Sequence, residues 1–382
     1  MFNKKHAMAG LYIHIPFCKQ RCRYCAFYST TLNDKRDEYA HALCRELTRR
    51  KEYAGEPVST IYFGGGTPSM LTCEQIERIM RTIKENYAIA PEPEITIECN
   101  PDDLTPERLA ALAACGFNRI SMGVQTFDDD ILKTIGRRHT AAAACEAVKN
   151  ARAAGFNNIS IDLIFALPGS TTQSWLHDLH TAISLRPTHI SAYNLMYEED
   201  TPLLRDLEEG KITELSEEEN LQQFAMLIDE LKKAGYRHYE ISNFALPGYE
   251  SRHNSSYWRG TPYTGCGAAA HSYNGTERRW NIANVTEYIK GINSGAPLFE
   301  SETLTTEEKY NDTVLTRLRT ADGLPLQYIK KEFGDTLYNY MMAAARPHIE
   351  RGNACEKDGN LTLTPQGVFI SDAVIRDLIF VE

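Results

Sequence analysis

The sequence predicts an α/β protein, with a partial TIM-like barrel of six β/α units and a smaller, mostly helical C-terminal domain. Apolar segments with the two-residue period of strands alternate with helical patterns from residue 10 to about 195. After about residue 301, helical patterns lead to a hairpin-like turn and a last helix, which is a winged-helix-like arrangement. Because six units do not close the eight-stranded ring of a complete barrel, we expect an open barrel with a lateral mouth.

Six short segments have the pattern of strands in a parallel sheet. They are residues 11–15, 60–63, 95–99, 119–123, 159–164 and 189–193. Helical patterns lie between them, at residues 34–53, 72–87, 106–115, 128–135, 141–154 and 172–185. Two helix starts are marked by their chemistry, since Thr72 and Gln75 have the spacing of a capping box and Pro106 suits a first helical turn.

The sequence divides into three regions, at 1–195, 196–300 and 301–382. The middle region predicts a helix at 217–234 ended by Gly235, a strand at 239–244 and then a long loop rich in His, Asn, Gly and aromatic residues. In the last region, the capping box of Thr305 and Glu308 begins a helix, and a turn at 357–360 precedes a strand at 361–364.

Composition narrows the functional class of this 382-residue chain. No apolar run approaches the roughly 20 residues that span a bilayer, and residues 1–10 lack the apolar core of a signal peptide, so we expect a cytoplasmic protein without a transmembrane segment. Ten cysteines without framework spacing suit a reducing compartment. The net charge of -10 argues against nonspecific nucleic-acid binding, although it leaves room for a local basic groove. A DNA-binding regulator that uses the C-terminal region is disfavoured, because acidic residues outnumber basic ones there.

Three of the ten cysteines lie close together, immediately after the first predicted strand. Cys18, Cys22 and Cys25 have the spacing C-x3-C-x2-C, which supplies three ligands to a 4Fe-4S cluster and leaves its fourth iron open for another ligand. A zinc site would require a fourth Cys or His, and no second pair follows. Lys19, Arg21 and Arg23 on this loop either offset the charge of a thiolate-bound cluster or are ordinary solvated charges.

Other polar residues follow the ends of the later strands. A triple glycine with Thr67 ends the second strand, Glu98 lies at the end of the third, and Gln125 follows the fourth. Arg137 is in a nearby turn and Asp162 is in the fifth strand. Each alone could be a helix cap or a surface residue, but the carboxyl ends of parallel strands meet at one ligand site. We therefore expect these residues to line a cofactor site with the cysteine loop.

Several motifs extend this pattern to a known family. The cysteine loop resembles the signature of radical S-adenosylmethionine (SAM) enzymes. The segments YIHIPFC, FGGGTPS, EITIECNP, SMGVQTF and IDLIFALPG resemble the oxygen-independent coproporphyrinogen III oxidase family. The resemblance implies a barrel of the radical SAM type. It also implies that SAM chelates the open iron and that an injected electron cleaves it to methionine and a 5'-deoxyadenosyl radical.

The resemblance also assigns site residues by position. It implies that Cys18, Cys22 and Cys25 bind the cluster. The positions that match SAM contacts are Tyr12, Tyr24, Gly65, Gly66, Thr67, Glu98, Gln125, Arg137 and Asp162, with Met196 and His271 matching more loosely. Arg137 suits a carboxylate, and Glu98 or Asp162 suits an ammonium or ribose hydroxyls.

Two departures favour the haem-chaperone branch of this family. The decarboxylating oxidases have a fourth cysteine where this chain has Phe27, and they have a longer segment before the first strand. The chaperone branch also carries an H-N-x-x-Y-W motif, which here begins at His253 and ends at Trp258. The resemblance makes His253 a candidate axial ligand of haem iron, with the aromatic pair as flat surfaces for the macrocycle. A packed loop histidine is the alternative.

The sequence therefore predicts a radical-SAM-type haem chaperone that holds a 4Fe-4S cluster, SAM and haem. Its expected partners are haem, a haem-acceptor protein that could be membrane-associated, and a reducing electron donor. The alternative is an active oxidoreductase of the coproporphyrinogen dehydrogenase type, which would decarboxylate coproporphyrinogen III to protoporphyrinogen IX with porphyrinogen as its substrate.

Overall fold

Six parallel strands form the centre of the fold. The computed structural model describes residues 9–53 and 57–381. The strands are β1 (Ala9–Ile15), β2 (Val58–Gly65), β3 (Ile89–Cys99), β4 (Arg119–Gln125), β5 (Asn158–Phe165) and β6 (His189–Asn194). They lie in sequence order, each parallel to the next. All six strands predicted from the sequence are thus confirmed, with longer bounds.

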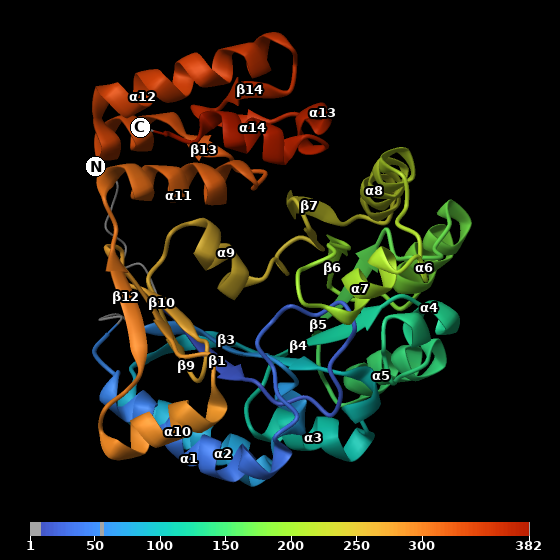
Figure 1. Ribbon diagram of the computed structural model, residues 1–382, viewed down its shortest axis with the longest axis vertical. Coiled ribbons are helices and arrows are strands. Elements are labelled where there is room, and N and C mark those ends of the chain that lie inside the picture. Colours follow the sequence, from blue (N-terminus) through green and yellow to red (C-terminus); the bar gives the residue numbers. More distant parts are fainter. Residues whose placement is uncertain (1–8, 54–56, 382) are drawn as a thin grey trace.

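Helices connect these strands and cover the sheet. They are α1 (Arg36–Arg49), α2 (Cys73–Asn86), α3 (Pro106–Ala114), α4 (Asp129–Thr134), α5 (Ala141–Ala153) and α6 (Thr172–Ser184). The capping box that the sequence predicts at Thr72 and Gln75 is present. Helices α1 to α3 lie on one face of the sheet (Figure 1), where their apolar residues pack against alternate strand residues such as Leu11, Ile13 and Ile61.

The middle region extends the same sheet at both edges. β8 (Asn243–Ala245) and β7 (Arg237–Glu240) follow β6, while β9 (Tyr263–Cys266), β10 (His271–Tyr273), β11 (Glu277–Asn281) and β12 (Phe299–Thr303) follow β1. The result is a 12-stranded sheet. β9 is parallel to β1, and the outer strands are antiparallel.

The single strand expected at 239–244 is wrong, because the chain reverses within it and forms the β7–β8 hairpin. The Glu240 carboxylate accepts hydrogen bonds from Ser242 N, at 3.1 Å, and from the Asn243 side chain, which closes the turn. The loop expected after residue 245 is also wrong in part, since residues 246–303 contain two helices and four short strands.

The remaining helices of this region are α7 (Pro202–Glu208), α8 (Glu217–Lys233), α9 (Arg252–Trp258) and α10 (Val285–Ser294). Helix α8 confirms the predicted helix and has a capping box at Ser216 and Glu219. Helix α9 lies between the sheet and the C-terminal domain (Figure 1). That domain consists of α11 (Thr306–Leu318), β13 (Leu324–Pro325), α12 (Leu326–Glu350), β14 (Ala354–Lys357), β15 (Asn360–Leu363), α13 (Pro365–Val368) and α14 (Ser371–Leu378).

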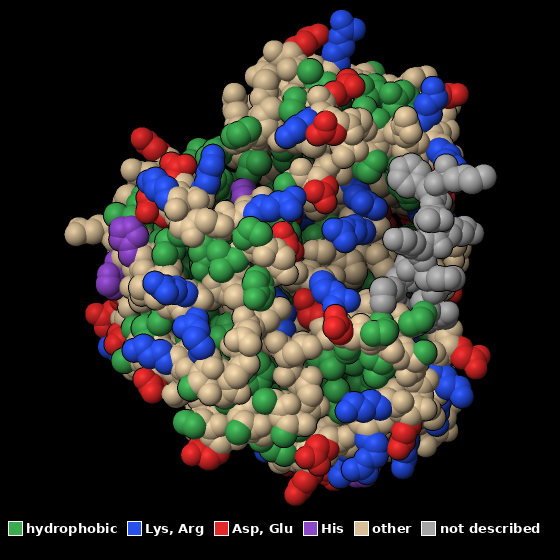
Figure 2. Space-filling view, turned by 180° about the vertical axis from the view of Figure 1, so that it is seen from behind, with side chains coloured by type: hydrophobic (Ala, Val, Ile, Leu, Met, Phe, Trp, Pro, Cys, Tyr) green, Lys and Arg blue, Asp and Glu red, His purple; other side chains and the backbone are tan. Residues whose placement is uncertain are grey.

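The C-terminal domain has an apolar core of its own, built around Tyr310, Leu324, Met341 and Val374. Its three strands form a separate antiparallel sheet in the order β13-β15-β14. Figure 2 shows acidic and basic side chains interspersed over the rear face of the molecule. Within residues 9–53 and 57–381, no helix is long and apolar enough to cross a membrane.

Candidate functional site

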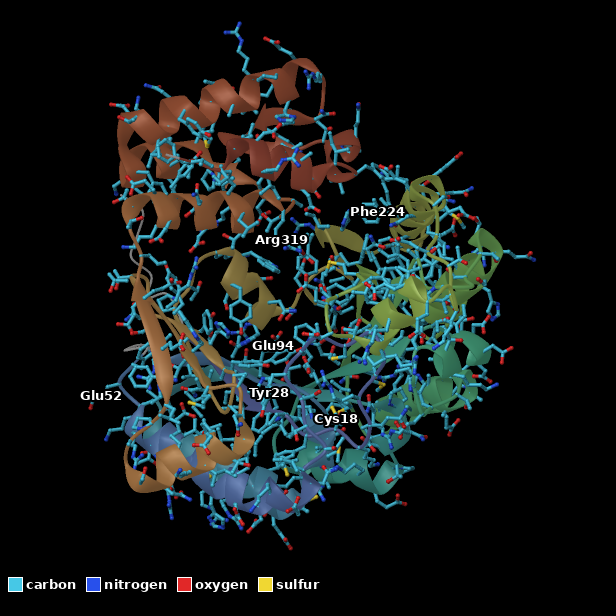
Figure 3. All side chains as sticks on the ribbon, viewed as in Figure 1. Cys18, Tyr28, Glu52, Glu94, Phe224 and Arg319 are labelled. Atoms are coloured by element: carbon cyan, nitrogen blue, oxygen red, sulfur yellow. The ribbon has the colours of Figure 1, made fainter. Side chains whose placement is uncertain are left out.

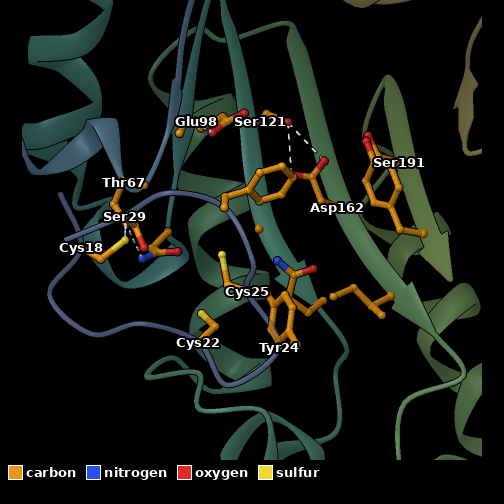
Figure 4. A pocket seen from close by; sticks show the side chains of 18 of the residues that line it. Cys18, Cys22, Tyr24, Cys25, Ser29, Thr67, Glu98, Ser121, Asp162 and Ser191 are labelled. Atoms are coloured by element: carbon orange, nitrogen blue, oxygen red, sulfur yellow. Dashed lines mark hydrogen bonds between the residues drawn. The ribbon is translucent and has the colours of Figure 1, made fainter. Parts of the chain in front are cut away.

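A pocket of about 630 Å³ lies at the carboxyl ends of the parallel strands. Figure 4 shows how the cysteine loop after β1 and the ends of β2 to β6 surround it. Twelve of the fifteen ligand residues predicted from the sequence line this pocket. They are Cys18, Cys22, Tyr24, Cys25, Gly65, Gly66, Thr67, Glu98, Gln125, Arg137, Asp162 and Met196.

The cysteine loop is held in place by backbone hydrogen bonds. Cys18 N donates to Thr30 O at 2.8 Å, and Arg23 N donates to Ile135 O at 3.0 Å. Cys18, Cys22 and Cys25 are free thiols and are only partly buried. Figure 4 shows the three side chains on the pocket side of one loop. The fold thus presents three unpaired sulfur ligands to a single space.

The surroundings of these thiols suit a bound cluster. Arg137 Nη1 donates to Cys22 Sγ at 3.3 Å and Thr67 Oγ1 to Cys18 Sγ at 3.6 Å, and hydrogen bonds to sulfur stabilise cluster thiolates. Burial raises the pKa of the Cys18 and Cys25 thiols, so iron is needed to keep them as thiolates.

The described residues contain no group of three His, Cys, Asp or Glu side chains placed to hold one metal ion. A cubane cluster has a different requirement, because each cysteine binds a separate iron.

Gly65 and Gly66 lie against the start of the cysteine loop. A Cβ on Gly66 would be 2.7 Å from the carbonyl carbon of Pro16, and a Cβ on Gly65 would be 2.6 Å from the His14 ring. Gly65 also has a φ of 113°, which disfavours other residues. These glycines therefore allow β2 to pack closely against the loop, and they leave backbone exposed to the pocket.

Two half-buried carboxyl groups also line the pocket. Glu98 accepts hydrogen bonds from Tyr62 Oη at 2.8 Å and from Gly65 N at 3.0 Å. Burial raises the pKa of Glu98 to about 7, although both hydrogen bonds oppose this. Burial likewise raises the pKa of Asp162 to about 6, while Ser121 Oγ donates to it at 3.2 Å. Both groups can therefore change protonation state near neutral pH.

Arginine side chains supply positive charge to the same space. Arg137 Nη2 donates to Asn100 Oδ1 at 2.8 Å, and its Nε is buried without a hydrogen-bond partner among the described residues. Arg119, which is 1% exposed, has two such nitrogens, Nε and Nη1. Because an unpaired buried donor is unfavourable, these nitrogens fit an anionic ligand group such as a carboxylate.

Gln125 adds a strained backbone to the pocket wall, with a φ of 71° in a residue other than glycine. Such strain persists only where the surrounding structure maintains it, and it is common at ligand sites. Gln125 is the last residue of β4 and lines the pocket.

Three of the sequence-predicted residues lie outside the pocket. Tyr12 is half-buried in β1, with its hydroxyl 3.0 Å from His14 Nδ1. His271 is exposed in β10, where its ring stacks on Trp280. His253 is 1% exposed in α9. Their contacts with a ligand stay predictions.

Both ring nitrogens of His253 are already engaged. Nδ1 lies 2.7 Å from Thr60 Oγ1 and Nε2 lies 2.7 Å from Tyr257 Oη. Burial, with Arg119 adding to it, lowers the pKa of His253 to about 3, so the ring is neutral. In this conformation neither nitrogen is free to coordinate iron, and the predicted haem ligation would require one of these hydrogen bonds to break.

The sequence reasoning missed several pocket residues, including Tyr62, Asn100, Arg119, Ser121 and Asn254. The sequence pattern of the fourth strand could have indicated two of these residues, Arg119 and Ser121. Arg119 and Ser121 alternate with the fully buried Ile120 and Met122, so the polar residues share one face of the strand. That face is the one that lines the pocket.

Comparisons with known proteins agree with this arrangement. Residues 12–182 match the Radical SAM superfamily, and residues 304–370 match the HemN C-terminal domain. The heme chaperone HemW of Bacillus subtilis (strain 168) is 36% identical over 373 residues, which cover 96% of this chain and 98% of the relative. The heme chaperone HemW of Escherichia coli (strain K12) is 34% identical over 326 residues, covering 83% of this chain and 84% of the relative.

The solved structure of coproporphyrinogen III oxidase (HemN) from Escherichia coli, described as a radical SAM enzyme, has a TM-score of 0.85 to this chain at 25% sequence identity. The match covers 97% of this chain and 90% of the oxidase. The α/β fold with a large parallel sheet and a smaller, mostly helical C-terminal domain is therefore shared with the oxidase. Together with the HemW relatives, this places the chain in the radical SAM superfamily and, within it, in the family of the HemW heme chaperones.

Proposed function

We propose that this protein is a haem chaperone of the radical SAM type, which holds a 4Fe-4S cluster and SAM in the strand-end pocket. The observation that carries the proposal is the convergence of the three free cysteines with Glu98 and Arg137 on one pocket. When bound, the cluster supplies an electron to SAM, and SAM supplies a carbon-centred radical.

The chain's own residues bind and orient this cofactor pair. Cys18, Cys22 and Cys25 would each bind one iron of the cluster. Arg137 Nε, which has no partner among the described residues, would donate to the SAM carboxylate, and the Glu98 carboxylate would accept from the SAM ammonium or ribose hydroxyls. The other assigned SAM contacts are Tyr12, Tyr24, Gly65, Gly66, Thr67, Gln125, Asp162, Met196 and His271. Of these, Tyr12 and His271 would contact SAM only after a rearrangement, since they lie outside the pocket.

Phe27 supports haem delivery over porphyrinogen decarboxylation. Its side chain lines the pocket and is 74% exposed, at the position where the oxidases have a fourth cysteine. A phenyl ring can neither bind iron nor transfer a proton, whereas it offers a flat apolar surface to a macrocycle.

The partners follow from this role. They are haem, a cytoplasmic or membrane-associated protein that accepts it, and a one-electron donor for the cluster. We place the chaperone in the cytoplasm, where a reducing environment keeps the cluster cysteines available.

One experiment separates the chaperone from the oxidase. The cluster is reconstituted without oxygen, SAM and a reductant are supplied, and haem binding is measured beside the formation of protoporphyrinogen IX. We expect stable haem binding without porphyrinogen turnover. Turnover of coproporphyrinogen III without haem binding would establish the oxidase instead.

A further inference from the structure

Exposed apolar side chains gather at the mouth of the pocket. Phe27 is 74% exposed and Met196 is 65% exposed, and both line the pocket. Tyr193, at the end of β6, also lines it and is 43% exposed. Phe27 comes from the cysteine loop, whereas Met196 and Tyr193 come from the end of β6 and the segment after it. Large apolar side chains left in water beside a cavity are typical of a ligand surface.

The same mouth has a positively charged side chain, Arg21. Lys19 pairs with Asp103 at 2.5 Å, and Arg23 pairs with Asp206. Each of these two positive charges is therefore already neutralised by an aspartate. Arg21 is exposed and lines the pocket, and it donates only to Cys25 O at 3.4 Å. It has no ion pair within the described part of the chain. A free guanidinium beside exposed aromatic surface suits a flat apolar ligand with a carboxylate.

The size of the pocket limits where a macrocycle can lie. Pockets of about 300–1,000 Å³ each hold one small ligand or cofactor, and this pocket has about 630 Å³. The cluster and SAM would share this space, so its open mouth is the part left for a porphyrin. The macrocycle must then lie across the mouth, over the bound SAM.

We propose that haem binds across the mouth of the SAM pocket, with its macrocycle on Phe27, Tyr193 and Met196 and a propionate on Arg21. This inference rests on the proposed haem-chaperone function and adds the location of the haem. Glu198 also lines the mouth, and its carboxylate repels a propionate. The opposite charges of Arg21 and Glu198 therefore orient the macrocycle.

The test compares haem with haem dimethyl ester, whose propionates carry no charge, on the anaerobically reconstituted full chain with SAM. Affinities are measured by absorbance titration for the unchanged protein, Arg21→Gln and Lys19→Gln. Lys19→Gln is the matched control, because it removes one positive charge from the same loop at a side chain that does not line the pocket. We expect Arg21→Gln to weaken haem binding about fivefold, with no effect on the ester and no effect of Lys19→Gln.

A second pair of variants tests the apolar surface. We expect Phe27→Ala to weaken binding of both haem and its ester by about tenfold. Leu32→Ala truncates a side chain that is 47% exposed and lies outside the pocket. This variant should leave the affinities for haem and for its ester unchanged. Met196→Ala tests the other side of the mouth and should weaken both ligands without altering the cysteine loop. Iron and sulfide contents of all variants must match.

The outcomes distinguish the two proposals. If the unchanged protein binds no haem, the chaperone function itself fails. If it binds haem while Arg21→Gln, Phe27→Ala and Met196→Ala bind as tightly as it does, only the location is overturned. Equal losses in Arg21→Gln and Lys19→Gln would also overturn it, because they would show a general charge effect.

Discussion

Arg137 connects the cysteine loop to the rest of the pocket. Its guanidinium donates to Cys22 Sγ at 3.3 Å and to Asn100 Oδ1 at 2.8 Å, and Nε is left unpaired. A lysine could not make these contacts together, because its single ammonium lacks the planar fork. At the scale of single residues, the site depends on a few hydrogen-bond donors, and the neighbouring strands set the directions in which these donors point.

The three loop cysteines should be required individually for the cluster. We expect Cys22→Ala to lower the bound iron and sulfide after anaerobic reconstitution by about tenfold, because two cysteines do not retain a cubane cluster. Cys355→Ala is the control, since Cys355 is a partly buried free thiol in β14 of the C-terminal domain. Unchanged iron content in Cys22→Ala would contradict the ligand assignment.

Glu98 should make SAM binding depend on pH. Its pKa is about 7, raised chiefly by burial, so the carboxyl is protonated below that pH and ionised above it. Only the ionised form attracts the SAM ammonium. We therefore expect the affinity for SAM to rise as the pH increases through 7. Below the pKa of Glu98, the rise should be at most about tenfold for each pH unit.

Equilibrium dialysis from pH 6 to pH 8 checks this for the unchanged protein and Glu98→Gln. Groups on SAM titrate in both proteins, so the ratio of the two dissociation constants isolates Glu98. A ratio that stays constant with pH would argue against this role.

Helix α9 shows how a short element is held by partners distant in the sequence. The Glu94 carboxylate accepts from Arg252 N at 3.1 Å and from His253 N at 3.0 Å, which caps the start of the helix. The guanidinium of Arg319, which follows α11 in the C-terminal domain, stacks over the Trp258 ring, with its Cζ atom 4.3 Å from the ring centroid. Figure 3 shows Glu94 and Arg319 on opposite sides of α9. The H-N-x-x-Y-W motif is therefore a packed bridge between the sheet and the C-terminal domain.

His253→Ala should destabilise this bridge. The hydroxyls of Thr60 and Tyr257 would lose their partner in a buried site, so we expect the free energy of unfolding to fall by about 1–3 kcal/mol. Thermal unfolding followed by circular dichroism measures this, with the neighbouring Ser255→Ala as control. An unchanged melting temperature together with an altered haem spectrum would instead show His253 to be a haem ligand.

At the scale of the whole molecule, the C-terminal domain and the barrel have separate apolar cores joined by a few polar contacts. Arg319 Nε donates to Glu240 Oε2 at 3.1 Å, and Arg317 Nη2 donates to Arg259 O at 2.9 Å. Phe224 and Phe369 form an edge-to-face ring pair across the same junction. The relative position of the two parts therefore depends on specific charged residues.

Arg319→Ala should loosen this junction. The Glu240 side chain is fully buried, and it would lose its charge partner. Because Arg319 is 26% exposed, we expect a loss of about 1–3 kcal/mol, below the usual effect of breaking a fully buried pair. Denaturant unfolding and limited proteolysis should show this, whereas Arg346→Ala, at an exposed ion pair, should have little effect. Equal protease resistance of the two variants would contradict it.

The sequence predicted the strands and helices of the barrel well because their signals are local. Period-two apolar segments, capping boxes and the glycine turn are each contained within a few residues, and all six central strands are present. The edge strands β9 to β12 were missed, since strands of three to five residues have too short a pattern to recognise. Their pairing is set by neighbours distant in the chain.

By itself, the sequence determined the cysteine loop and its place after the first strand, because those features depend on spacing along the chain. The strand ends and the family resemblance added the other predicted residues of the pocket, which bring the predicted ones to twelve. Only the tertiary structure showed that His253 is buried with both nitrogens bound, and that Arg21 alone of the three loop cations has no ion pair among the described residues. Burial and charge pairing are decided by residues far apart in sequence, such as Asp103 and Asp206, which folding brings to the loop.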